Sequence, residues 1–392
     1  MTTTPQLPFV QESPLDIAPE LRAIQRGTIH RVRTATGDEA WLVLDYAHVR
    51  QLLDDERLGR AHPDPQNAPR VSESPLLGIV MGNFETEAAD HAVMRNLLQP
   101  HFSPKHLRAL VPRVEEFTTA LLDEMVEQGP PADLHSQLAM PLPILVICEL
   151  LGVPYSDRDQ FRQWTEDVGN LEDRTRSERG MAELFGYSMK LVQHKRAHPD
   201  DDVISRLSAA DDLDDTGATL LSFALLFAGH ETTVVQISLG TLMLLANRDQ
   251  WSMLQNQPAL IPRAVEELMR ASTMGATVGG IPRYARSDFD FNGVTIHAGD
   301  LVLLDIISAN HDPTVFADPE QLTITRNEAA HLSFGFGPHY CVGAQLARIQ
   351  LQTVFTQLIR RFPSMQLTCD PAAVPMRQDT ITGGLVQLPV SW

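Results

Sequence analysis

The chain has 392 residues, of which 31 are Lys or Arg and 50 are Asp or Glu, so its formal charge is −19. This acidic balance, without any Lys/Arg-rich run, argues against binding to nucleic acid or to anionic membrane surfaces. Hydrophobic residues make up 43% of the chain and charged residues 21%, an ordinary globular composition that excludes a largely disordered protein.

Cysteine usage and the N-terminus predict a cytoplasmic protein. The three cysteines, Cys148, Cys341 and Cys369, are too few for a disulfide framework and favour a reducing compartment. The first residues show no export signal. The longest apolar stretches, near 141–151 and 220–228, are shorter than the roughly 20 residues needed to span a bilayer. We therefore expect no membrane association.

The first elements in chain order are a short apolar strand at 40–44 and an amphipathic stretch at 46–53. From about His91 to Asp201 apolar residues recur every three or four positions, which predicts helices separated by polar loops. Residues 216–246 are predicted to form the longest uninterrupted helix, because they contain no proline and are apolar on nearly every side. We expect a glycine within it to mark the close approach of another group.

Beyond Arg270 the period of the pattern changes to two residues. A hairpin is predicted at 289–296 around the Asn292-Gly293 turn, with a buried strand at 301–306 and the last strand signals at 380–392. The predicted fold is mainly α with small β-sheets (α+β). We expect a single large domain of residues 1–392, with strand-rich portions near 28–60, 280–310 and 374–392.

The most informative stretch is 334–348, a glycine-punctuated loop that places Cys341 just before an amphipathic helix. The amides and dipole of a helix N-terminus favour a thiolate, and a bound metal favours it further. Gly337 permits the turn, and Gly343 removes a side chain where the helix would press against a flat cofactor. The residues alone leave a buried structural cysteine as the alternative.

This loop resembles the cysteine-ligand motif of the cytochrome P450 family, Phe-x-x-Gly-x-His/Arg-x-Cys-x-Gly. The resemblance extends from about Pro8 to Trp392 and implies the P450 fold. It implies that Cys341 is the thiolate ligand of the iron in haem b. The defining positions are Phe334, Gly337, His339, Cys341 and Gly343.

A second resemblance lies in the long predicted helix, where 228–233 is similar to the family's oxygen-activation motif. A Glu and two Thr are costly in an apolar helix unless they are paired or wetted. By position, Thr232 is the motif's alcohol and Glu231 is the acid that supplies it with protons. Ala228 and Gly229 are expected to leave room for a ligand and water, and His230 is expected to be structural.

Haem carries two propionates, which an acidic protein holds only by placing cations locally. Four residues match the family positions that bind these propionates, namely His91, Arg95, Arg283 and His339. Glu267 and Arg270 resemble the family's Glu-x-x-Arg pair, which we read as structural. Arg326 is the candidate for its usual third member, although the departure at 322–323, where Phe-Asp is usual, counts against that contact.

The resemblance implies a monooxygenase that uses O2 and two electrons to hydroxylate or epoxidise an apolar small molecule. Its overall similarity is to enzymes that tailor secondary metabolites such as polyketides, macrolides or terpenoids. No Gly-x-Gly-x-x-Gly and no iron–sulfur cysteine set is present, so a ferredoxin and its NAD(P)H reductase are implied. A basic docking patch is expected from Lys105, Arg108, Arg113 and Arg348.

The residues leave several alternatives open. A peroxide-dependent or redox-neutral enzyme would share the cofactor, whereas a non-catalytic haem sensor or a zinc protein using His339 and Cys341 would belong to another class. Pocket walls are expected from 61–85, 161–190, the residues around Phe223 to Ala228, 276–281 and the Thr382 turn. Their aromatic side chains would line an ordinary core equally well.

Overall fold

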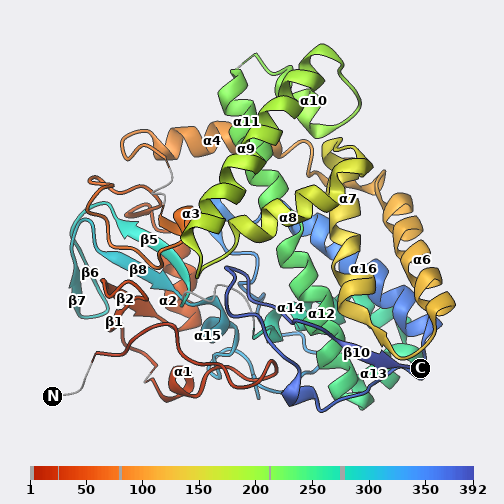
Figure 1. The fold of residues 1–392 in the computed structure, drawn as a ribbon. Helices are drawn as coiled ribbons and strands as arrows, with labels where there is room; N and C mark the ends of the chain where they lie inside the picture. The colour runs from red at the N-terminus through yellow and green to blue at the C-terminus, as the bar shows by residue number, and fades with distance from the viewer. Residues whose placement is uncertain (1–3, 25, 79–81, 212, 274–278) are drawn as a thin grey trace. The chain divides into compact units, whose positions relative to one another are not determined.

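The computed structural model describes residues 4–24, 26–78, 82–211, 213–273 and 279–392. Its contacts divide the chain into two compact units, unit 1 with residues 1–93 and 263–341 and unit 2 with residues 94–262 and 342–392 (Figure 1). Helices predominate and the strands form small sheets, as the sequence predicts. That residues 1–392 form a single domain stays a prediction.

Unit 1 is built on a five-stranded sheet of order β1-β2-β8-β5-β3. β2 and β8 are parallel, with Trp41 opposite Val302, and the other neighbouring pairs are antiparallel. Side chains of the sheet, α2 and the β6–β7 hairpin form one hydrophobic core that also contains Leu332, two residues before the cysteine loop. The elements are α1 (Pro19–Ala23), β1 (His30–Arg33), β2 (Glu39–Val43), α2 (Tyr46–Leu53), β3 (Leu58–Gly59), α3 (Pro75–Gly78), β5 (Ile281–Ala285), β6 (Phe289–Phe291), β7 (Val294–Ile296), β8 (Leu301–Leu304), α15 (Ile306–Asn310) and η4 (Gly337–His339).

The predicted hairpin is confirmed as β6 and β7. Asn292 and Gly293 both have positive φ, 47° and 82°, which is the backbone that a two-residue turn between twisted strands requires. The amphipathic stretch at 46–53 is confirmed as α2, and its buried face consists of Val49, Leu52 and Leu53.

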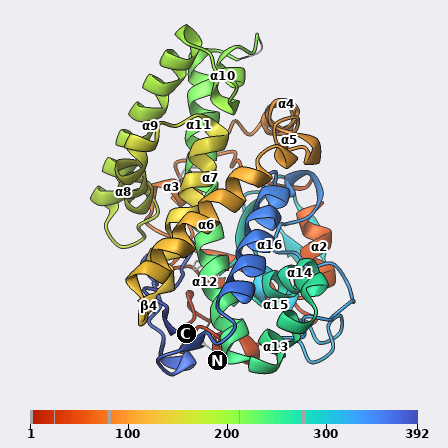
Figure 2. The same cartoon turned by 90° about the vertical axis from the view of Figure 1, so that its right-hand side faces the viewer.

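Unit 2 is mainly helical, with α12 at its centre. α12 packs against α7, α13, α16 and η1, and Figure 2 shows α6 and α16 alongside one another. A three-stranded sheet of order β4-β10-β9 completes the unit. The elements are α5 (Pro104–Arg108), α6 (Val111–Gln128), β4 (Ala132–Asp133), η1 (His135–Ala139), α7 (Pro141–Leu151), α8 (Arg158–Val168), α9 (Arg174–Ala197), α10 (Val203–Ser208), α11 (Asp215–Ala228), α12 (Glu231–Ala246), α13 (Arg248–Asn256), α16 (Ala344–Arg361), β9 (Gln366–Leu367) and β10 (Pro389–Ser391).

Two further helices include the positions where the chain passes between the units: α4 (Glu87–Leu98) and α14 (Ile261–Ala271). They carry His91, Arg95, Glu267 and Arg270.

The prediction of one uninterrupted helix over 216–246 is wrong, because the helix is broken at Gly229 and His230 into α11 and α12. At Gly229 an added Cβ would lie 2.5 Å from the Cδ1 of Ile147 on α7. A side chain at this point would therefore require Ile147 to shift, and glycine also weakens the helix. Helical hydrogen bonding resumes in α12, where the amides of Thr233 and Val234 donate to the carbonyl of His230.

By length and composition Asp215–Ala246 is apolar enough to cross a membrane, which corrects the expectation that every apolar stretch is too short. Half of its most apolar window is buried inside the structure. Within unit 2, twelve of the sixteen residues of α12 are buried, including Val234, Leu239 and Leu244. The hydropathy of this segment is therefore explained by its place in a protein core.

Candidate active site

Main-chain hydrogen bonds and steric contacts restrict the backbone of the cysteine loop at residues 334–341, which belong to unit 1. The amide of Cys341 donates to the carbonyl of Phe334 over 2.8 Å, and the amide of Tyr340 donates to Gly337 over 3.0 Å. Gly337 has a φ of 68°, and a Cβ there would lie 2.3 Å from Oδ1 of Asp54, so no other residue fits. Sterics and main-chain bonds together fix the position from which the Cys341 side chain projects.

Two cysteines of the chain lie in opposite environments. Cys341 is exposed, so the structure contradicts the alternative of a buried structural cysteine at this position. Cys148 on α7 is buried, and that burial raises the pKa of its thiol to about 12. A thiol that ionises so reluctantly is neither a nucleophile nor a metal ligand at neutral pH. Of these two, Cys341 is therefore the one that can serve as a ligand.

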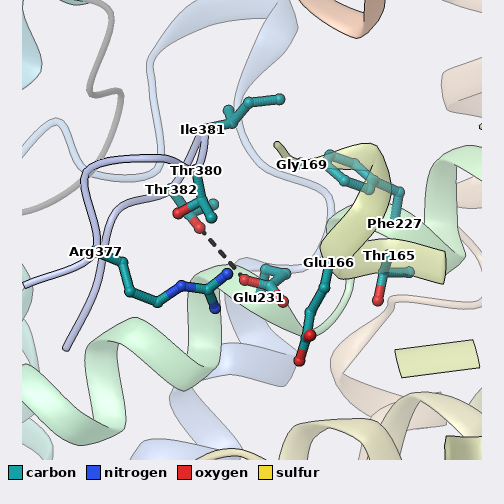
Figure 3. Close-up of a pocket in the computed structure, with 9 residues that line it drawn as sticks. All are labelled: Thr165, Glu166, Gly169, Phe227, Glu231, Arg377, Thr380, Ile381 and Thr382. Carbon is teal, nitrogen blue, oxygen red and sulfur yellow. Dashed lines mark hydrogen bonds between the residues drawn. The ribbon is translucent and has the colours of Figure 1, made fainter. Parts of the chain in front are cut away.

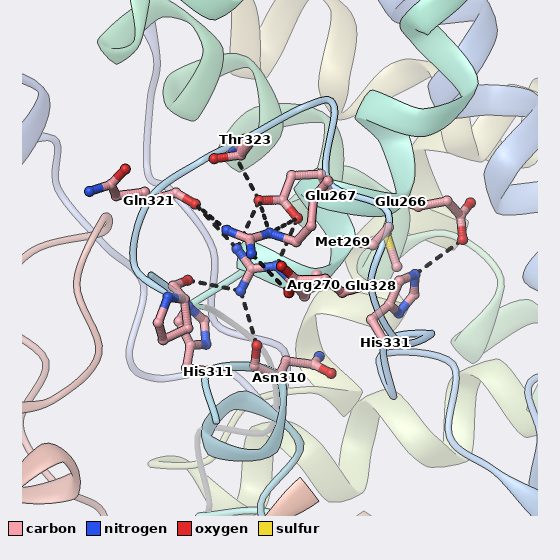
Figure 4. A network of polar contacts seen from close by, with 12 residues as sticks. Glu266, Glu267, Met269, Arg270, Asn310, His311, Gln321, Thr323, Glu328 and His331 are labelled. Atoms are coloured by element: carbon pink, nitrogen blue, oxygen red, sulfur yellow. Dashed lines mark hydrogen bonds and ion pairs between the residues drawn. The ribbon is translucent and has the colours of Figure 1, made fainter. Parts of the chain in front are cut away.

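A buried ion network stands behind the cysteine loop in unit 1 (Figure 4). Arg270 donates from Nε to Oε2 of Glu267 over 2.7 Å and from Nη2 to Oε1 over 2.9 Å. Arg326 donates from Nε to both oxygens of Glu267 over 3.1 Å. The pair is confirmed, and so is the third contact that the departure at 322–323 counted against. Glu267 has a further donor in the main-chain amide of Thr323, 2.9 Å from Oε1, which any residue except proline would supply at this position.

Backbone and side-chain hydrogen bonds connect this network to the loop. Arg270 donates from Nη1 to the carbonyl of Asn310 over 3.0 Å. Asn310 accepts from the amide of Leu332 over 2.7 Å and donates to Oγ of Ser333 over 2.9 Å. Since Leu332 and Ser333 immediately precede Phe334, the buried charges fix the residues that lead into the cysteine loop.

Two residues predicted to hold the propionates are brought together in unit 1. The rings of His91 and His339 lie 4.1 Å apart between centroids. Arg283 on β5 is buried in the same unit. Its burial and, to a smaller extent, the positive charge of Arg60 lower the pKa of its guanidinium to about 10, whereas the negative charge of Glu87 acts in the opposite direction. The buried cation Arg283, with the half-buried Arg60 close enough to repel it, fits a ligand that brings carboxylates.

The remaining cofactor candidates of this group are Arg95, Gly343 and Phe334. Arg95 follows His91 by four residues on α4, as the motif predicts, and Gly343 is the N-cap of α16. Phe334 is buried, and its ring packs at a tilt against His331 and Tyr340. Their roles toward a cofactor stay predictions.

Glu231 lies in unit 2, in the first turn of α12, with its side chain only 16% exposed (Figure 3). Oε2 accepts a hydrogen bond from Oγ1 of Thr382 over 3.4 Å, and Oε1 lies 3.5 Å from Nε2 of His230. Burial alone would raise the pKa of this carboxyl. The hydrogen bond and charge of His230, the charge of Arg377 and the bond from Thr382 nevertheless hold the pKa below its ordinary value.

The neighbours of Glu231 separate into an exposed and a buried side. Ala228 and Thr232 are exposed and four residues apart, whereas Thr233 is buried. His230 is 1% exposed, with Nε2 3.1 Å from Oγ1 of Thr165 and its ring against Phe161. Thr232 is therefore the more exposed of the two threonines, whereas its role as the motif's alcohol and the structural role of His230 stay predictions. A Cβ at Gly229 would meet Ile147, and the expectation that this glycine leaves room for a ligand and water also stays a prediction.

Glu231 lines a small cavity in unit 2. Three segments far apart in sequence contribute to it: α8 and its C-terminal end, the α11–α12 break and the chain at 377–382. Three of the expected wall regions meet here, represented by Thr165, Phe227 and Thr382. The expected wall residues 79–81 and 276–278 lie outside the described residues.

The expected basic patch in unit 2 is only partly available. Lys105 and Arg108 lie exposed on α5, which packs against α16, the helix of Arg348. Arg113 is instead paired: its Nε donates to Oε1 of Glu149 over 3.1 Å, and it also contacts Glu116. Two carboxylates offset its charge, so the structure removes Arg113 from the patch.

The sequence did not identify Arg60 or Arg377 as parts of these sites. Each lies outside any recognisable motif, and Arg377 is 146 residues from Glu231. Only the fold brings them near the residues that motifs identify. Within the described ranges, no three His, Cys, Asp or Glu side chains form a set that could hold a metal ion, so the zinc alternative gains no support from the geometry.

Residues 37–389 match the Cytochrome P450 family. The chain is 39% identical to pentalenolactone synthase of Streptomyces exfoliatus, covering 100% of both. It is 35% identical to the mycinamicin IV hydroxylase/epoxidase of Micromonospora griseorubida, covering 93% of this chain and 92% of that one. The solved structure of substrate-free cytochrome P450 PimD, a polyene macrolide antibiotic pimaricin epoxidase, has a TM-score of 0.88 and 39% identity over 100% of both chains.

The chain therefore belongs to the cytochrome P450 family, and its predicted fold class is confirmed. It is a cytochrome P450 monooxygenase, which replaces the alternative of a non-catalytic sensor. Membership implies haem, O2 and a small-molecule substrate. The residues of unit 1 fit that cofactor, since they provide an exposed cysteine on a fixed loop together with the buried cation Arg283, which is suited to a carboxylate.

Proposed function

We propose that this P450 uses O2 and two electrons from a ferredoxin, itself reduced by an NAD(P)H reductase, to hydroxylate or epoxidise an apolar secondary metabolite. A polyketide, macrolide or terpenoid is the expected substrate class. The exposed thiol of Cys341 on its fixed loop is the observation that carries the proposal. Relatives named for pentalenolactone, mycinamicin IV and pimaricin support the substrate class.

Residues of unit 1 would bind and orient haem b. Cys341 would provide the thiolate ligand, and the loop hydrogen bonds would fix its direction. His91, His339 and Arg283 would bind the propionates, with Arg95, which belongs to unit 2, as a further cation. When bound, haem supplies the reductive activation of O2 and the insertion of one oxygen atom into a C–H or C=C bond.

Residues of unit 2 would hold and move the protons that this reduction consumes. Glu231 is held as a carboxylate at neutral pH, so it can accept a proton from the cavity that it lines. The neighbouring residue Thr232, which is exposed, would receive that proton on its hydroxyl and donate a proton to the O2 that is being reduced. The intact Glu231–Thr232 pair favours an O2-dependent enzyme over the peroxide-dependent or redox-neutral alternative.

The ligand assignment is tested by replacing Cys341 with Ala. We expect the red-shifted Soret band of the reduced carbon monoxide complex to disappear, because this band depends on thiolate ligation. Cys369→Ala, which removes another exposed cysteine, is the matched control and should retain the band. Persistence of the band in Cys341→Ala would remove the ligand assignment.

The substrate class is tested by spectral titration of the ferric protein with macrolides, terpenoids and small polar acids. A substrate that displaces water from the iron changes the Soret band, and apolar natural products should do so selectively. Turnover with ferredoxin and O2, compared with peroxide alone, then separates the two enzymatic alternatives. Efficient product formation with peroxide alone would favour a peroxide-dependent enzyme.

A further inference from the structure

The chain at 376–385 forms a hairpin-like turn that is tied to the connection between α8 and α9. Met376 pairs with Leu385, and the amide of Arg377 donates to the carbonyl of Gly384 over 2.8 Å. The amide of Ile381 donates to Gly169 over 3.0 Å, and the amide of Leu171 donates to Asp379 over 2.8 Å. Backbone bonds therefore fix the turn beside the end of α8. We call residues 376–385 the clamp turn.

The clamp turn brings Arg377 to the cavity that Glu231 lines. In Figure 3 the guanidinium of Arg377 extends toward the Glu231 carboxylate, on the same side as Thr382. Arg377 is also 3.9 Å from Oδ1 of Asp379, and its side chain is 26% exposed. It thus reaches from the surface of unit 2 into the cavity.

A largely buried carboxylate needs compensation, and the three groups that supply it differ in kind. Thr382 offers one neutral hydrogen bond at 3.4 Å, and Nε2 of His230 lies 3.5 Å from Oε1 of Glu231. Arginine stays charged at every pH that a protein experiences, so Arg377 provides a permanent positive charge beside the carboxylate. Among the groups that lower the pKa of the Glu231 carboxyl, its charge ranks directly after the hydrogen bond and charge of His230.

We propose that Arg377 is a positioning residue for Glu231: with Thr382, it holds the carboxylate ionised and directed into the cavity from the clamp turn. Proton supply would then depend on a segment 146 residues away from the acid, and not on the α11–α12 break alone. This inference rests on the proposed role of Glu231 in the reaction.

Other charged groups face the same region and define the competing effects. Glu166 lines the cavity from α8 and is paired with Arg162 over 3.2 Å. His135 on η1 is influenced by the charges of Glu231 and Arg377, and Asp379 neighbours Arg377 on the clamp turn. A test must therefore separate the charge of Arg377 from a general disturbance of this part of unit 2.

The test follows the ionisation of Glu231 by infrared difference spectroscopy of the holoenzyme during a pH titration. Subtraction of Glu231→Gln identifies the carboxyl band. In Arg377→Gln we expect this band to titrate at higher pH than in the wild type, whereas Arg377→Lys, which retains the charge, should restore most of the difference. Arg174→Gln is the control, because Arg174 makes an exposed pair with Glu178.

Thr382→Val provides a second variant should Arg377→Gln fold poorly. It removes one hydrogen bond at nearly constant volume, so the band should move in the same direction by less. With a ligand selected by the spectral screen, Arg377→Gln should lose roughly tenfold in coupled product formation while its spectral Kd stays unchanged.

An unmoved band in Arg377→Gln, or an equal movement in Arg174→Gln, would overturn the role of Arg377. Such a result would leave the proposed function intact if wild-type turnover with ferredoxin and O2 is normal. Conversely, a wild type that makes no product under these conditions would overturn the proposed function, while the titration of Glu231 would still report on Arg377.

Discussion

The cysteine loop of unit 1 and the Glu231 region of unit 2 hold their key residues in different ways. Behind the loop, Glu267 receives charged donors at 2.7 to 3.1 Å and is only 3% exposed. Around Glu231 the contacts are longer, 3.4 Å from Thr382 and 3.5 Å from His230, and a cavity adjoins them. A ligand must stay in one place, whereas a group that carries protons must exchange partners. The two arrangements match these two needs.

The strongest way to break this comparison is to remove the centre of the rigid network. Glu267→Ala leaves Arg270 and Arg326 buried without their carboxylate, which should cost about 3–5 kcal/mol of unfolding free energy. Urea unfolding of the holoprotein measures the loss. Glu178→Ala removes an exposed pair with Arg174 and should cost less than about 1 kcal/mol. Equal losses in the two variants would show that the buried network has no special role.

The same contrast explains what the sequence could and could not predict. The cysteine loop could be predicted because its determinants are contiguous and glycine conformation restricts the residue at Gly337. The helix break was not predicted: Gly229 and His230 lie between α11 and α12, and the side chain that packs against Gly229, Ile147, comes from another helix. Arg326 binds Glu267 although the usual Phe-Asp is missing at 322–323. The contact that Glu267 makes at position 323 comes from the main-chain amide of Thr323 and not from its side chain.

Long-range side-chain partners were likewise out of reach. Arg377 lies outside any motif, and only the clamp turn brings it to Glu231. The docking patch shows the converse: Arg113 looked available as a cation in the sequence, but α7 presents Glu149 to it. Motifs of contiguous residues thus identified ligand and acid, and tertiary packing decided which charges accompany them.

The second prediction concerns the Glu231 region. Thr232→Ala should retain haem and substrate binding but lower coupled product formation by about 10²-fold, with electrons diverted into hydrogen peroxide. Its exposure implies that little packing is lost. Product and peroxide per NAD(P)H consumed measure the effect. Thr233→Val is the matched control, because Thr233 is buried on the same helix, and it should remain coupled. Tight coupling in Thr232→Ala would contradict a role in proton transfer.

The third prediction concerns α15, which carries Asn310 toward the cysteine loop. Burial raises the pKa of its N-cap Asp305 from 3.8 to about 6, so between about pH 4 and 6 the folded state binds more protons and stability falls as pH rises. Burial lowers the pKa of His311 from 6.5 to about 4, so in that range stability rises with pH. The two contributions oppose one another.

Single substitutions should therefore reveal how Asp305 and His311 each make the stability depend on pH. Asp305→Asn keeps a capping side chain and should gain about 2 kcal/mol relative to wild type as pH rises from 4 to 6. His311→Gln should show a downward trend relative to wild type over the same range. Thermal unfolding across this range measures both. Parallel pH profiles for all three proteins would exclude this opposition.

The smallest effect is expected at the docking patch. Reversal of Lys105 and Arg108 to Glu should slow electron transfer from the ferredoxin by about fivefold at low salt and by less at high salt, because exposed charges act through screened steering. Arg113→Gln is the discriminating comparison: since Glu149 and Glu116 already offset its charge, it should leave the rate and its salt dependence nearly unchanged. Reduction monitored by stopped-flow under carbon monoxide measures both. A larger effect from Arg113 than from the pair on α5 would show that the partner approaches the Glu149 side of unit 2 instead.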